Sequence, residues 1–152
     1  MTYPSIFDPA TLRDNLERID RLAPDTYPHW GRMNVAQMLA HLNVAYDLET
    51  GRVTSGNNLF QRILARTVGK WMVTGPRPYP KNMATAPVFL VSPDQDFERE
   101  RKRLIANLRR VTAAGAAVYE GKPNPSFGKL TAAQWSVLFQ KHLDHHLRQF
   151  GV

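Results

Sequence analysis

The apolar residues of this chain recur at helical spacing in four long segments, and this pattern constrains the fold more than any other feature. In the second segment, for example, Met38, Leu39 and Leu42 fall on one side of a helix. Strand-like character is nearly absent, and residues 87–91 (PVFLV) are the single candidate. The four segments cover residues 8–19, 34–51, 94–114 and 131–150. We therefore predict an all-α fold in which four long amphipathic helices form a bundle.

Capping residues mark the ends of these segments. Asp8 precedes Pro9, and proline suits the first helical position because its missing N–H would have no partner there. Asn34 is a typical N-cap, and Thr131 followed by Gln134 has the spacing of a capping box. The later segments end at glycines: Gly51, Gly115 and Gly151. These signals predict the helix boundaries independently of the hydrophobic pattern.

The chain between the second and third long helices is predicted to be an insertion. A shorter helix is expected over residues 58–71. Residues 74–93 hold five of the eleven prolines and cannot be helical, since proline lacks the N–H that a helix needs. A connection of this length is either functional or a mis-assigned element. Residues 121–129 form a second connection rich in proline and glycine.

Composition limits the class of protein. A length of 152 residues suits a single domain, residues 1–152, and the absence of cysteine removes disulfides, thiolate ligands and a cysteine nucleophile. The chain shows neither a secretory signal nor a run of about 20 apolar residues, so we expect a cytoplasmic protein without a membrane span.

The net charge of +7 is concentrated near residues 99–110. A solvated helix face explains this charge best; nucleic-acid binding, with no aromatics interleaved, and steering of an acidic substrate are the alternatives.

The last helix carries three histidines, and their spacing separates them. His142 and His146 are four residues apart, so both imidazoles lie on one helical face. A helical wheel places this face on the apolar side, with His145 at its edge. Three positions are predicted to point outward: Lys141, Asp144 and Arg148.

His41 lies within the wide apolar stripe of the second helix. Each buried imidazole needs a polar partner, so three inward histidines are costly in a chain of this size. Three histidines of packed helices can hold one transition-metal ion. From the residues alone, a metal site, a buried polar network and a surface-facing cluster all remain open.

Several motifs of the chain resemble the DinB-like superfamily. HLDHHLRQ is similar to its His-x-x-x-His-x-x-Gln ending, and VAQMLAHLNVAYD resembles the second helix with its lone histidine. The wider likeness lies in SIFDPATLRD, WGRMNVAQMLAHLNVAYD, PYPKNMATAP, FGKLTAAQW and KHLDHHLRQFGV. Together these motifs look like an uncharacterised branch of that superfamily, a domain of unknown function that spans nearly the whole chain.

The resemblance implies an up-down-down-up four-helix bundle, often a homodimer, with a divalent metal near one end. The ligand positions of the superfamily correspond to His41, His142 and His146, and its glutamine corresponds to Gln149, which would hydrogen-bond a ligand histidine. Three neutral imidazoles leave a coordination position open, as in catalytic sites, and suit zinc, nickel or iron.

Characterised members of the superfamily include bacillithiol transferases and mycothiol-dependent maleylpyruvate isomerase. The resemblance therefore suggests a metal-dependent transferase that activates a low-molecular-weight thiol for attack on a small-molecule substrate. Lys81 and Arg77 on the proline-rich segment would bind acidic groups of the thiol. A metal-dependent hydrolase that uses bound water, and a non-catalytic metal-binding or stress-response protein, are the alternative functions.

Overall fold

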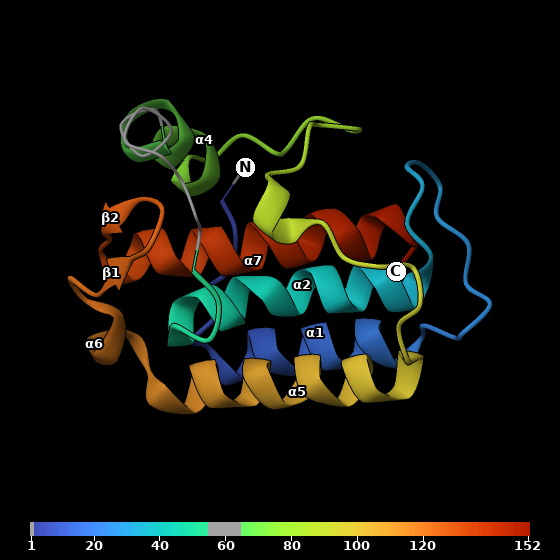
Figure 1. Ribbon diagram of the computed structural model, residues 1–152. Coiled ribbons are helices and arrows are strands. Elements are labelled where there is room, and N and C mark those ends of the chain that lie inside the picture. The colour runs from blue at the N-terminus through green and yellow to red at the C-terminus, as the bar shows by residue number, and fades with distance from the viewer. Residues whose placement is uncertain (1, 55–64) are drawn as a thin grey trace.

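Four long helices dominate the computed structural model, which describes residues 2–54 and 65–152 (Figure 1). They are α1 (Pro9–Asp20), α2 (Val35–Thr50), α5 (Phe97–Ala114) and α7 (Ala132–Gln149). In Figure 1, α1 and α7 run from left to right, whereas α2 and α5 run from right to left. The predicted all-α fold is confirmed, because the described strands are confined to one two-stranded sheet. The finer prediction of an up-down-down-up bundle is compatible with these directions.

The helices begin where the capping residues predict. The Asp8 side chain accepts a hydrogen bond from the Ala10 N–H at 2.8 Å, and Asn34 caps α2 in the same way. Thr131 and Gln134 form the reciprocal bonds of a capping box. The third long helix begins at Phe97, three residues later than predicted, because the carboxylate of Asp96 serves as its N-cap.

The insertion between α2 and α5 contains short helical elements and irregular chain. These elements are η1 (Ala65–Gly69), α4 (Lys70–Thr74) and the 3-10 turn η2 (Pro87–Phe89). The helix predicted over residues 58–71 falls partly on residues 58–64, which lie outside the described part of the chain. Residues 87–91, the single candidate for a strand, contain this 3-10 turn and no strand. Pro87 begins a turn in which the Phe89 N–H bonds to the Ala86 carbonyl at 2.9 Å, so the backbone is satisfied locally.

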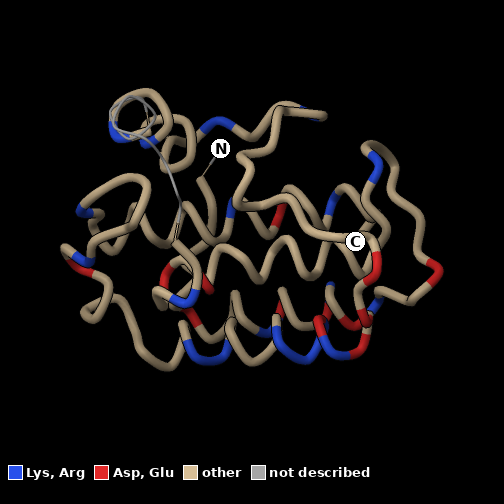
Figure 2. The backbone as a smooth tube through the Cα atoms, in the orientation of Figure 1, with Lys and Arg blue, Asp and Glu red and all other residues tan. Residues whose placement is uncertain are grey.

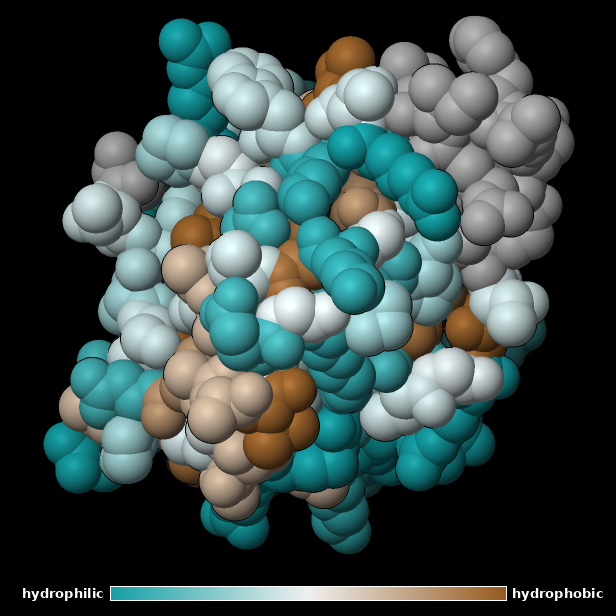
Figure 3. Space-filling model, turned by 90° about the vertical axis from the view of Figure 1, so that its left-hand side faces the viewer, coloured by the Kyte–Doolittle hydropathy of each residue, from teal (hydrophilic) through white to brown (hydrophobic). Residues whose placement is uncertain are grey.

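Residues 121–129, predicted as an irregular connection, contain the small sheet. It follows α6 (Ala116–Tyr119) and consists of β1 (Pro123–Asn124) and β2 (Gly128–Lys129), which pair antiparallel. The Asn124 side chain accepts from the backbone N–H groups of Ser126 and Phe127 and so closes the turn. Figure 3 looks onto this end of the molecule, where hydrophobic areas are interspersed among hydrophilic residues.

The core lies around α2, which packs against both α5 and α7. Almost every residue of α2 is buried, unlike a surface helix with one polar side. Tyr46 stacks on Phe139 of α7 with ring centroids 4.7 Å apart, and Trp135 is fully buried beside them. The central position of α2 gives it two different polar contacts, one with α5 and one with α7.

Charged residues gather on the outside of α5. Figure 2 shows both signs of charge along this helix. Lys102 and Arg109 are exposed, as a solvated face requires, whereas Glu100 is buried toward α2. Among the described residues, no helix has the length and apolar character needed to cross a membrane.

Candidate metal centre

Three histidines from two helices converge at the contact between α2 and α7. His41 comes from α2, and His142 and His146 come from successive turns of α7. One ring nitrogen of each lies within 4.8 Å of the others, and the Nε2 atoms of His41 and His142 are 3.0 Å apart. His41 and His146 are buried, while His142 is half-buried. The structure thus brings together the three residues that the spacing of the sequence selects.

Hydrogen bonds orient two of these imidazoles. Nδ1 of His41 lies 3.0 Å from the carbonyl oxygen of Phe89, and Nδ1 of His146 lies 2.7 Å from Oε1 of Gln149. Both oxygens are acceptors, so each Nδ1 carries the proton and each Nε2 keeps its lone pair. The Gln149 amide is itself fixed, because its Nε2 donates to the carbonyl oxygen of Trp30 at 2.7 Å. Outer partners of this kind orient the histidine ligands of metal ions.

The three imidazoles are electrically neutral at neutral pH. Burial lowers the pKa of all three histidines, that of His142 well below its usual value and that of His146 to about 3. The nearby imidazoles lower the pKa values of His142 and His146 further. Neutral imidazole is the form that binds a metal ion.

The donor set fits a transition-metal ion. In a tetrahedral site with zinc–nitrogen bonds of about 2.0–2.1 Å, ligand nitrogens lie about 3.3 Å apart, close to the separation of the His41 and His142 nitrogens. Without an ion, the Nε2 atoms of His41 and His146 are both acceptors. Within the group of three, the Nε2 of His142 can donate a single proton, so one of the two acceptors is left without a donor. A cation held by all three nitrogens would remove that deficit.

Aromatic rings surround the cluster. The Phe89 ring lies 5.3 Å from the His41 ring and 5.6 Å from the His142 ring, measured between centroids. His145, predicted at the edge of the inward face, is half-buried and contacts His146 at 5.0 Å. Its ring also meets Trp30 and Tyr79 edge-on, so it forms part of the surroundings and lies outside the group of three.

The chain matches one known protein family over nearly its whole length. The model of a family described as "Protein of unknown function (DUF1569)" matches residues 6–151. The chain belongs to this family. Searches of the curated proteins and of the solved structures found no match. Membership of the DUF1569 family therefore names no reaction.

The two cations predicted to bind substrate lie in different places. Nζ of Lys81 sits 4.4 Å from the centre of the Trp30 ring, and Trp30 in turn contacts His145. The guanidinium of Arg77 lies 5.9 Å from the Trp71 ring of α4. Both cations are exposed. Lys81 is therefore linked to the surroundings of the histidines through one side chain, whereas the described contact of Arg77 is with the insertion itself.

The outward position predicted for Lys141 is wrong. Its side chain is almost fully buried, and Nζ donates to the carbonyl oxygens of Met72 and Gly75 at 2.6 and 3.1 Å. The same ammonium lies 4.4 Å from the centre of the Tyr79 ring, and burial lowers its pKa. A helical wheel for a plain bundle leaves this side of α7 in solvent, but the insertion covers it. Sequence spacing carries no signal of that contact.

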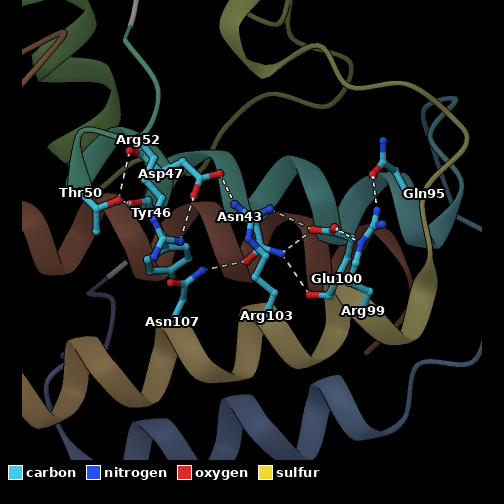
Figure 4. A network of polar contacts seen from close by, with 10 residues as sticks. All are labelled: Asn43, Tyr46, Asp47, Thr50, Arg52, Gln95, Arg99, Glu100, Arg103 and Asn107. Carbon is cyan, nitrogen blue, oxygen red and sulfur yellow. Dashed lines mark hydrogen bonds and ion pairs between the residues drawn. The ribbon is translucent and has the colours of Figure 1, made fainter.

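A second polar cluster, for which the sequence holds no signal, lies on the side of α2 that faces α5 (Figure 4). Asn43 is fully buried and donates to the backbone oxygen and the carboxylate of Glu100, both at 3.0 Å. The side-chain amide of Asn107 donates to Oδ1 of Asn43 at 3.0 Å, and Arg103 pairs with both Asp47 and Glu100. We name this group the α2–α5 network, and it also includes Glu49 with its partners Arg110, Tyr119 and Lys122.

Proposed function

We propose that this DUF1569 protein binds a divalent transition-metal ion through His41, His142 and His146 and uses it in thiol transfer. One observation carries the metal proposal: three neutral imidazoles present their nitrogens within 4.8 Å, and two are oriented by Nδ1 hydrogen bonds. The likeness of the motifs to the DinB-like superfamily supports the thiol chemistry. The donor set suits zinc or nickel, and iron as well.

The residues around the site supply binding and orientation. A bound divalent ion lowers the pKa of a coordinated thiol, so that the thiolate is available near neutral pH. Gln149 and the Phe89 carbonyl fix the orientation of the two buried imidazoles, which keeps the fourth coordination position of the ion free for a ligand. We assign to Lys81 and Arg77 the role of binding the acidic groups of the thiol. The predicted homodimer belongs to the same proposal.

Among the described residues, the candidate ligand group contains no carboxylate. Asp144, the carboxylate nearest in sequence, is held by Arg18 and Arg148, each at 2.9 Å. An amide hydrolase would also need an acid to protonate its leaving group, and this carboxylate is already paired with two arginines. A thiol transferase whose substrate releases a stable anion needs no such acid, because the ion lowers the pKa of the bound thiol.

The first test is metal content. Protein purified without an affinity tag should carry about one divalent ion per chain, as expected for three ligands that share one ion. His41→Ala, His142→Ala and His146→Ala should lose it, and His145→Ala, the matched control on the same helix, should retain it. Mass spectrometry of the metal and circular dichroism of each variant give the result. Absence of metal, with no uptake of added zinc or nickel, would refute the proposal.

The second test is the reaction. The metal-loaded protein is mixed with a small thiol and 1-chloro-2,4-dinitrobenzene, where a carbon–sulfur bond forms, chloride leaves and the thiol proton passes to buffer. Conjugation should exceed the uncatalysed rate and vanish in His142→Ala. Ester hydrolysis without any thiol would instead indicate the hydrolase. Metal-dependent stabilisation without either reaction would indicate a non-catalytic binding protein.

A further inference from the structure

Phe89 touches the candidate metal centre with both its main chain and its side chain. It ends η2, which packs against α2 (Figure 1). Its carbonyl oxygen receives the Nδ1 proton of His41, and its ring lies against His41 and His142. The ring meets His142 almost perpendicularly, at 84°, and His41 at 49°. Phe89 is therefore fixed relative to two of the three proposed ligands.

The exposure of the histidines shows from which side a ligand arrives. His41 and His146 are 5% and 7% exposed, whereas His142 is half-buried. A donor molecule must then approach beside His142, where the Phe89 ring packs against the imidazole. An aromatic ring offers no strong hydrogen-bond acceptor and resists compression, so it limits both the polarity and the width of the approaching group.

We propose that Phe89 is the specificity-determining residue of the proposed metal site. Its ring narrows the approach to the open coordination position, which then admits slender donors, such as a thiolate on an unbranched carbon, and disfavours ring-shaped donors. The inference rests on the proposed function, because it presupposes an ion held by His41, His142 and His146. It names the class of ligand that this ion accepts.

Cobalt-substituted protein tests this role without any substrate. Co²⁺ reports added ligands through its visible absorption, and azide and imidazole serve as a slender and a ring-shaped donor. The variants are Phe89→Ala and Phe89→Leu, which keep the backbone carbonyl that orients His41. The matched control is Leu90→Ala, because Leu90 is the next residue and is 70% exposed.

Wild type should bind azide and bind imidazole weakly. Phe89→Ala should tighten imidazole binding by about tenfold or more, the scale on which apolar pockets separate ligands by size. Phe89→Leu should fall between the two, azide affinity should stay within about twofold throughout, and Leu90→Ala should match wild type.

Two failures can be told apart. If wild type binds cobalt and all four proteins take up imidazole equally, the role of Phe89 is refuted and the metal site stands. If wild type takes up no cobalt, the metal site itself is refuted, and the role of Phe89 is refuted with it. Equal loading of the variants, measured by metal analysis, excludes misfolding as the cause of a difference.

Discussion

Helix α2 carries buried polar groups on two sides and satisfies them in opposite ways. Toward α5, Asn43 bonds to Glu100, and Asp47 pairs with Arg103 (Figure 4). Toward α7, the polar partners of His41 among the described residues are other imidazoles and the Phe89 carbonyl. The first side matches donors with acceptors and positive with negative charge. The second side gathers neutral nitrogens that cannot all satisfy one another.

This difference separates a structural network from a candidate binding site. Buried polar groups in folded proteins are nearly always paired, so a complete set of partners needs no ligand. Glu49 illustrates the complete case: burial would raise its pKa, yet hydrogen bonds from Arg110 and Lys122 lower it below the usual value. The histidine cluster lacks such charge partners among the described residues, and a cation would supply one.

The largest expected effect is stabilisation by metal, confined to the α7 side. Zinc at a free concentration of a thousand times its dissociation constant should raise the free energy of unfolding by about 4 kcal/mol. Denaturant titrations with and without zinc measure this change. His142→Ala should abolish it, while Asn43→Ala, on the α5 side, should preserve it at lower overall stability. An equal zinc effect in His142→Ala would place the metal elsewhere.

The next effect belongs to the α2–α5 network. Glu49→Gln removes the charge that Arg110 and Lys122 share and should lower the free energy of unfolding by about 3 kcal/mol. Zinc should stabilise this variant as much as wild type. Asp20→Asn is the control, because Asp20 is 81% exposed and its pair with Arg101 should contribute less than about 0.5 kcal/mol. A loss for Glu49→Gln as small as that control would mean that the network contributes little.

The pH dependence of stability also distinguishes the α7 side of α2 from its α5 side. The pKa of His146 is about 3 in the folded protein, against an ordinary 6.5, so the unfolded chain binds the proton more readily. The stability of metal-free protein is therefore complete above pH 6.5 and falls as pH drops below it, by about 2 kcal/mol for His146 alone by pH 5. His146→Gln should flatten this slope. Glu49→Gln should keep it, since the lowered pKa of Glu49 makes its contribution disappear only below pH 4.5. An unchanged slope in His146→Gln would contradict the neutral cluster.

The smallest effect concerns Lys141, a buried cation on the α7 side that no described carboxylate pairs with. Lys141→Met loses two hydrogen bonds to carbonyl oxygens at the end of α4, which destabilises the fold. It also removes a desolvated charge, which stabilises it, so the free energy of unfolding should change by no more than about 1 kcal/mol. Amide hydrogen exchange should nevertheless accelerate in residues 72–79, which lose their anchor on α7. Lys102→Met, on the exposed face of α5, should leave that exchange unchanged. A loss of several kcal/mol would instead make Lys141 a central part of the core.

The sequence was sufficient where the signal is local. Asp8, Asn34 and Thr131 begin their helices as predicted, because a cap needs only the next three residues. The pair His142 and His146 follows from helical periodicity in the same way. His41 could be added because the apolar stripe of α2 already requires it to point inward.

Only the tertiary structure decided what depends on contacts between distant segments. Lys141 is buried because the insertion folds back over α7. Pro87–Phe89, within the only candidate strand of the sequence, form a 3-10 turn beside His41. The α2–α5 network was invisible for the same reason: Asn43 and Glu100 have ordinary polar side chains until the two helices pack. Spacing along one helix determines which side chains share a face, but which face meets which neighbour depends on the packing of the whole chain.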